Sequence, residues 1–162
     1  MVIFNIVKYA IDSIYALVKK SPDEIDSLVK QSLMQLSASY GSLRRGSKPN
    51  YSQWPTWVAY IYKYVPAHAN FLYQIIQNTP GLPEKFQTEE IRLCSIGGGP
   101  GSDVLAVSKY LARHRLNTPM RARVYDRELG WEHVWKLLSS QLSPPLSNDQ
   151  ISTSYHLLDL DR

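Results

Sequence analysis

Four glycines follow a short apolar segment within five residues, and they form the clearest chemical signal in the sequence: Gly97, Gly98, Gly99 and Gly101. Glycine allows backbone angles that other residues avoid, and its missing side chain lets a ligand approach the main chain closely. A helix is predicted to begin at Ser102, and the amino-terminal end of a helix carries a partial positive charge. The segment from residue 91 to 103 therefore predicts a strand, a turn and a helix that hold a nucleotide-like ligand.

The spacing of these glycines separates three classes of ligand. A phosphate-binding loop would place a lysine after its last glycine, but Gly101 is followed by Ser102 and Asp103. The dinucleotide fingerprint G-x-G-x-x-G would require glycine, or at least alanine, at Ser102. A nucleoside triphosphate is therefore disfavoured, and a nicotinamide-dependent enzyme stays a third hypothesis.

The remaining pattern, G-x-G-x-G, lies within the segment LCSIGGGPGSD. This segment resembles the first motif of the class I, Rossmann-like S-adenosylmethionine-dependent methyltransferases, and the resemblance extends over residues 55 to 162. It implies that S-adenosylmethionine is the cofactor, with the four glycines beside its methionine part. In that family an acidic residue commonly precedes the first glycine by two positions, whereas this sequence has Ser95. A hydroxyl binds an amino group more weakly than a carboxylate does, and Asp103 is a candidate substitute.

Two carboxylates stand where the resemblance requires them, at the ends of the next two predicted strands. Asp126 ends the segment RARVYD, and the resemblance implies that it binds the ribose hydroxyls. Asp159 follows YHLL and would accept a hydrogen bond from the adenine amine, while Leu158 or Leu160 covers the ring. Further candidates to line the pocket are Glu128, Trp131, Tyr60 and Tyr64.

The elements that position these residues alternate between strand and helix. Such alternation is typical of α/β proteins with right-handed crossovers. We expect a partial Rossmann-like three-layer parallel sheet of three strands, preceded by an all-helical amino-terminal region. The predicted strands cover residues 91–96, 122–125 and 151–158, and the helices between them cover 102–116 and 128–142.

The region before the sheet, residues 1–88, is predicted to be a helical extension or cap, and residues 89–162 the amino-terminal half of the cofactor-binding domain. Ser21 and Glu24 form a capping-box pattern at the start of one helix, which the polar stretch from Ser37 should end. Pro66 should split an aromatic stretch into two short helices, because proline loses a helix hydrogen bond. The expected helices lie in residues 2–19, 22–36 and 54–78, with apolar stripes at Trp57, Tyr60, Ile61 and Tyr64 and at Phe71, Leu72, Ile75 and Ile76.

Three strands are fewer than the seven of a complete class I methyltransferase sheet. The residues after the fourth strand, where this family often positions its substrate, are missing from the sequence, so the catalytic residues remain unknown. The first strand should expose an unpaired edge, which favours self-association or a partner chain.

The bulk composition excludes few functions. The chain has 162 residues, is 44% hydrophobic and carries a formal net charge of +4. Its single cysteine, Cys94, excludes an intramolecular disulfide and a paired-cysteine metal site, and we expect it to be buried in its strand. The apolar first segment is too short and too charged to span a membrane, so we expect a cytoplasmic or nuclear protein.

Basic residues gather in two parts of the sequence. We interpret both as solvated faces, with binding of RNA, DNA or another polyanion as the alternative. The two groups are Arg44, Arg45 and Lys48, and Arg113, Arg115, Arg121, Arg123 and Arg127.

The leading hypothesis is the cofactor-binding portion of a methyltransferase. Its methyl acceptor is unknown and could be a small molecule, RNA or protein. The alternative is a truncated, non-catalytic methyltransferase-like module that survives through its interactions.

Overall fold

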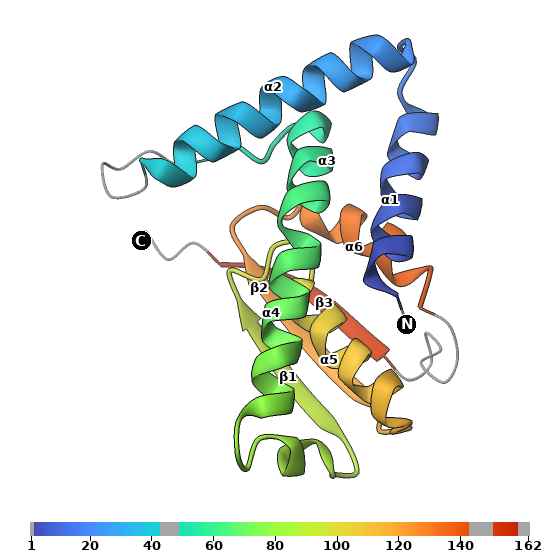
Figure 1. Cartoon of the computed structure of the whole chain (residues 1–162), viewed down its shortest axis with the longest axis vertical. Coiled ribbons are helices and arrows are strands. Elements are labelled where there is room, and N and C mark those ends of the chain that lie inside the picture. Colours follow the sequence, from blue (N-terminus) through green and yellow to red (C-terminus); the bar gives the residue numbers. More distant parts are fainter. Residues whose placement is uncertain (1, 43–48, 143–150, 159–162) are drawn as a thin grey trace.

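A helical region precedes a three-stranded sheet in the computed structural model, which describes residues 2–42, 49–142 and 151–158. The chain therefore belongs to the α/β class (Figure 1). In chain order the elements are α1 (Ile3–Leu17), α2 (Pro22–Gly41), α3 (Trp54–Lys63), α4 (Val65–Asn78), the short 3-10 helix η2 (Pro83–Phe86), β1 (Ile91–Ile96), α5 (Ser102–His114), β2 (Met120–Asp126), α6 (Trp131–Ser139) and β3 (Ile151–Leu157).

Helix α2 begins where the capping-box pattern predicts. The Ser21 hydroxyl accepts a hydrogen bond from the Glu24 amide at 3.3 Å, and the Glu24 carboxylate accepts one from the Ser21 amide at 3.0 Å. The helix continues past Ser37 to Gly41, so the predicted end is wrong. Ser37 donates a hydrogen bond to the Leu33 carbonyl at 2.8 Å and accepts one from Lys63 on α3 at 2.7 Å. Its polar side chain is therefore satisfied within the helical region.

The predicted break at Pro66 is confirmed, since α3 ends at Lys63 and α4 starts at Val65. The predicted stripe on α4 is wrong in part, because Phe71 and Ile75 are 68% and 38% exposed. Helix α4 packs against α5 and buries Ile76 of the predicted stripe together with three residues outside it: Val65, Ala69 and Tyr73. Apolar residues lie on more than one side of α4, so its sequence alone does not determine which side is buried. Packing against α5 determines it.

The three strands are parallel, in the order β1-β2-β3. The register aligns Ile91 with Met120 and Met120 with Ile151. Helices α5 and α6 cover the same face of the sheet, on which alternate strand residues are largely buried. This alternation gives one packed face and one solvated face, although the strands are parallel.

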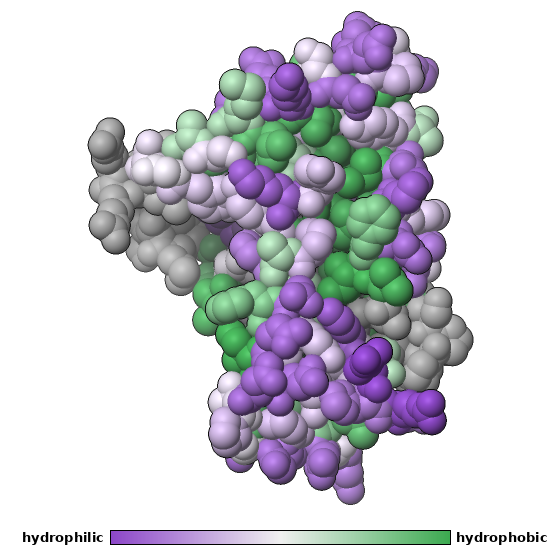
Figure 2. All heavy atoms as spheres, viewed as in Figure 1, coloured by the Kyte–Doolittle hydropathy of each residue, from purple (hydrophilic) through white to green (hydrophobic). Residues whose placement is uncertain are grey.

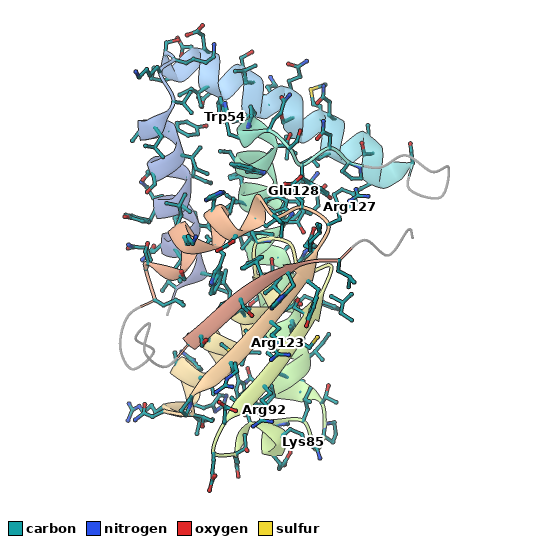
Figure 3. The ribbon with its side chains drawn as sticks, turned by 180° about the vertical axis from the view of Figure 1, so that it is seen from behind. Trp54, Lys85, Arg92, Arg123, Arg127 and Glu128 are labelled. Carbon is teal, nitrogen blue, oxygen red and sulfur yellow. The ribbon has the colours of Figure 1, made fainter. Side chains whose placement is uncertain are left out.

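The opposite face of the sheet, here called the open sheet face, carries no covering element among the described residues. Figure 3 shows it from behind, with Arg92 and Arg123 on the side of the viewer. Only two layers are thus described where three were expected. The open sheet face consists of Arg92, Cys94, Ile96, Arg121, Arg123, Tyr125, Ser152, Ser154 and His156.

Cys94 belongs to the open sheet face and is exposed, so the prediction of a buried cysteine is wrong. The apolar neighbours of Cys94 in the sequence, Leu93 and Ile96, suggested burial on both faces of the strand. Since helices cover only one face, every second residue of β1 contacts solvent.

A continuous apolar core joins the helical region to the sheet, from Ile3 on α1 to Ile151 on β3. Trp131 on α6 is its largest fully buried side chain. On the face seen in Figure 2, hydrophobic side chains gather between α3 and α1, whereas the surface over the lower part of α5 is mainly hydrophilic. None of the helices in the described ranges is long and apolar enough to cross a membrane.

Candidate functional site

A pocket of about 270 Å³ opens at the carboxyl ends of the strands, beneath residues from the helical region. Open α/β sheets commonly bind their ligands in this place. The pocket combines polar main chain and a carboxylate on the sheet side with aromatic rings on the helical side. Its lining consists of Tyr40, Tyr51, Tyr60, Gly97, Gly99, Tyr125, Asp126, Arg127, Trp131 and Leu158.

Two glycines of the turn, Gly97 and Gly99, form part of the pocket wall. Their φ angles are 65° and 51°, in the left-handed region that favours glycine. A β-carbon added at Gly97 would meet no atom within 4 Å, so the main chain there stays open to a ligand. At Gly99 the nearest atom to an added β-carbon is the Tyr60 hydroxyl, at 3.7 Å.

The other two glycines are required by packing and do not line the pocket. A β-carbon at Gly98 would collide with the Ser95 hydroxyl and would lie 2.8 Å from Val124. At Gly101, where φ is 88°, it would lie 2.6 Å from the Trp135 ring. These two positions bring the start of α5 close to the sheet and to α6.

Asp126, at the end of β2, holds the glycine turn and the loop after β2 together. One carboxylate oxygen accepts a hydrogen bond from the Gly99 amide at 2.9 Å, and the other accepts one from the Glu128 amide at 2.9 Å. A carboxylate offers about four acceptor positions, so each oxygen can still accept one more hydrogen bond. Asp126 lines the pocket and is therefore able to bind ligand hydroxyls while it keeps both amide partners.

The amides of the glycine turn already have acceptors. The Gly97 and Gly98 amides donate to the Tyr125 carbonyl at 2.7 and 3.4 Å, and the Gly99 amide donates to Asp126. A phosphate in such a turn would need these amides, and the adjacent carboxylate would repel it. The turn thus disfavours a phosphate or pyrophosphate ligand more strongly than the spacing of its glycines does.

Ser95, the predicted partner of the cofactor amino group, lies away from the pocket lining. Its side chain is only 3% exposed and donates a hydrogen bond to the Asp103 carboxylate in the first turn of α5. Ser95 and Asp103 are thus brought together with each other, on the covered face of the sheet. From the sequence, these two residues were alternative partners for the amino group of the cofactor.

Aromatic rings from three helices and one loop form the wall opposite the glycine turn. The rings of Tyr60 and Trp131 lie 5.1 Å apart, and Tyr51 lies 5.3 Å from Trp131 and 5.7 Å from Tyr60, edge to face. Tyr40, near the end of α2, forms a hydrogen bond of 2.6 Å with the Tyr51 hydroxyl. Such rings favour a planar ring system or a cation.

Sequence reasoning identified Tyr60 and Trp131 as pocket candidates but missed Tyr40 and Tyr51. Tyr51 lies in a polar loop, where its position is fixed by the Trp57 indole, which donates to the Tyr51 carbonyl at 2.5 Å. No periodic pattern marks either residue. Tyr64 packs against Tyr60 at 5.2 Å and supports the wall from behind.

The structure locates some of the remaining predicted residues, and the others lie outside the residues that it describes. Leu158 lines the pocket after β3. Glu128 uses its carboxylate to accept from the Gly130 amide at 3.0 Å. Asp159 and Leu160 lie outside the described residues, as do Arg44, Arg45 and Lys48. Within the described ranges no three His, Cys, Asp or Glu side chains cluster as a metal site would require.

Burial raises the pKa of the Tyr51 and Tyr60 phenols above their ordinary value of 10.0, and the neighbouring Tyr40 phenol adds to the effect at both. The charge of Asp126 raises the pKa of Tyr60 further. Burial also raises the pKa of the Tyr155 phenol.

The native state holds the protons of these phenols more tightly than the unfolded state does. We therefore expect full stability below pH 10 and a progressive loss as the pH rises above the unfolded value. Absorbance at 295 nm and circular dichroism, followed together from pH 8 to 12.5, should show part of the tyrosine titration coinciding with unfolding. Complete titration of all tyrosines while the native spectrum persists would contradict this expectation.

Comparison with known proteins assigns the chain to no family. No protein-family model matches the chain, and no curated protein matches it. The fold and the pocket define an α/β protein, Rossmann-like in character, with a candidate ligand site at the carboxyl ends of a parallel sheet.

Proposed function

We propose that this chain is the cofactor-binding portion of an S-adenosylmethionine-dependent methyltransferase. The observation that carries the proposal is the position of Asp126, which lines the pocket, accepts the Gly99 amide and retains acceptor capacity toward the cavity. The glycine turn and the carboxylate come from the ends of adjacent strands, which is the arrangement that the resemblance implies.

Each wall of the pocket suits a different part of this cofactor. Asp126 accepts hydrogen bonds from the ribose hydroxyls, Gly97 leaves room for the chain that carries the amino acid group, and Leu158 covers the adenine ring. The electron-rich faces of Tyr51 and Tyr60 favour a positively charged group. When bound, the cofactor supplies a methyl group on a sulfonium cation, which such rings accommodate better than they do a phosphate.

The domain arrangement proposed with this function assigns residues 1–88 to a cap and residues 89–162 to the sheet that carries the cofactor. Tyr40 and Tyr51 from the cap and Asp126 from the sheet line one pocket. The finer expectation, the amino-terminal half of a Rossmann-like methyltransferase fold, belongs to the same proposal. So do the roles of Asp159 and Leu160 at the adenine ring.

Isothermal titration with S-adenosylmethionine and with its demethylated product tests the proposal. We expect micromolar to submillimolar binding by the parent chain and a loss of about tenfold or more for Asp126→Asn, because charged hydrogen bonds to hydroxyls are lost. Asp12→Asn removes the same charge from the exposed surface of α1, where the side chain is 59% accessible, and should leave binding unchanged. Thermal unfolding of each variant establishes that it is folded at the temperature of the titration. No binding by the parent at millimolar ligand, or equal binding by the parent and Asp126→Asn, would refute the proposal.

A second function, the non-catalytic interaction module, is favoured by one observation. The outer edges of β1 and β3 have no strand partner in the described part of the chain. Such a module would bind the cofactor without methyl transfer and form a stable complex with a partner. Retained binding without turnover, together with such a complex, would select it over the enzyme.

A further inference from the structure

We infer that the open sheet face binds single-stranded nucleic acid, an activity that does not depend on the proposed cofactor. The face presents guanidinium groups on β1 and β2 and aromatic rings on β2 and β3, all directed away from the helices. Single-stranded nucleic acids are commonly bound by this combination, in which basic groups contact the backbone and rings stack on bases.

The charge on this face favours a polyanion. Arg92, Arg121 and Arg123 lie close together, since Arg92 and Arg121 are register partners and Arg123 follows on the same side of β2. Glu90 accepts from Arg92 at 2.8 Å and contacts Arg121 at 3.1 Å. One carboxylate therefore meets two guanidinium groups, which are 82% and 61% exposed. No carboxylate of the described residues lies within ion-pair distance of Arg123, so the face keeps a net positive charge.

The rings on this face favour bases over other anionic partners. Tyr125 and His156 are register partners on β2 and β3, and their rings are stacked at 5.0 Å with an interplanar angle of 24°. The His156 side chain contacts the Ser154 hydroxyl at 2.9 Å, which holds the imidazole beside the phenol. Two stacked rings next to a row of arginines form a platform on which a base can stack while its phosphates contact the guanidinium groups.

Other occupants of the open sheet face fit less well. A second copy of this chain would place arginines opposite arginines, which is unfavourable. An apolar helix would bury Arg121 and Arg123 without partners, at a high free-energy cost. An acidic peptide would satisfy the charges but would not need the stacked rings.

Anisotropy titration of a fluorescein-labelled 12-mer of oligouridylate with the full chain tests the inference. We expect binding at low salt, with an affinity that falls steeply as salt is added. His156→Ala should weaken binding about fivefold or more, as the loss of a base-stacking ring does. Arg123→Gln should weaken it several-fold and reduce the magnitude of the salt slope by about 0.7, the value for one phosphate of a single strand.

The matched control is Arg113→Gln, which removes the same charge from an exposed position on α5. It should change neither the affinity nor the salt slope. Neither Arg123 nor His156 lines the cofactor pocket, although the His156 ring stacks on Tyr125, which does. Titration of both variants with S-adenosylmethionine therefore separates a loss of nucleic-acid binding from a loss of cofactor binding. Circular dichroism and light scattering establish that each variant is folded and that the oligomeric state is unchanged.

Four results would overturn the inference. The first is an absence of binding at low salt, and the second is an equal loss for Arg113→Gln and Arg123→Gln. The third is binding of polyglutamate as tight as that of the oligonucleotide and insensitive to His156→Ala, which would assign the face to an acidic protein partner. A dimer that dissociates in Arg123→Gln would assign it to a second copy instead.

Discussion

Replacing Gly101 by alanine should destabilise the chain by about 2–5 kcal/mol and lower the midpoint of thermal unfolding by roughly 4–20 °C. Two physical effects add at this position. The φ angle of 88° lies in the left-handed region, where an L-residue costs about 1–2 kcal/mol. The added methyl group would also lie 2.6 Å from the Trp135 ring, which is 5% exposed and packed in the core.

Gly81 supplies the control that separates these two effects. Its φ angle is 79°, and an added β-carbon there would meet no atom within 4 Å. Gly81→Ala should therefore show only the conformational part, about 1–2 kcal/mol. Urea or thermal unfolding followed by circular dichroism measures both variants. If the two variants lose equal stability, the contact with Trp135 contributes nothing and Gly101 is retained for another reason.

A loss of stability in Gly101→Ala would show that the glycine motif serves packing as well as ligand binding. All four glycines look equivalent in the sequence, because spacing alone cannot distinguish a position that faces a ligand from one that faces a helix. In the structure Gly97 and Gly99 line the pocket, whereas Gly98 and Gly101 allow α5 and α6 to pack against the sheet. The motif therefore combines a ligand surface with a packing requirement.

The fold was predictable from the sequence to a large extent, because its signals are local. The capping box at Ser21, the break at Pro66 and the alternation of strand and helix each depend on residues close together in the chain. The open sheet face was not predicted, since three layers and a buried Cys94 were expected, although the sequence of β2 contains a signal for it. β2 reads Met-Arg-Ala-Arg-Val-Tyr-Asp, and its strict alternation is typical of a strand with one solvated face.

The aromatic wall of the pocket was not predictable to the same extent. Tyr40 is near the end of a helix, Tyr51 is in a loop and Trp131 begins α6, so their meeting depends on how the helical region lies over the sheet. The prediction that Ser95 binds the cofactor amino group also failed. The alternation of β1 places Ser95 on the covered face of the sheet, where its hydroxyl donates to Asp103 and does not reach the pocket.

The open sheet face also bears on how the proposed cofactor site could meet an acceptor. Tyr125 lines the pocket and also contributes to the groove on the open sheet face that contains Arg92, Arg121 and Arg123. A strand of nucleic acid on that face would therefore lie next to the mouth of the pocket. The two proposals are tested separately, but together they would favour RNA among the acceptor classes that the sequence leaves open.

Replacing Gly97 by asparagine should abolish cofactor binding, or weaken it about a hundredfold, while the chain stays folded, because a side chain placed in the pocket excludes the ligand. Asparagine tolerates the left-handed region better than other residues with a β-carbon, so the φ angle of 65° is compatible with it. The space beyond the Gly97 α-carbon contains no atom within 4 Å of an added β-carbon. The new side chain therefore enters the pocket instead of displacing the core.

Gly81→Asn is the matched control, since Gly81 also has a positive φ angle and open space around it but lies in an exposed loop away from the pocket. Titration of both variants with S-adenosylmethionine, alongside their thermal unfolding, separates two explanations of the turn. Equal stability with binding lost only in Gly97→Asn would mean that the cofactor approaches the main chain at Gly97. Unchanged binding by Gly97→Asn would place the cofactor elsewhere, because no ligand seated against that turn could share the space with an asparagine side chain.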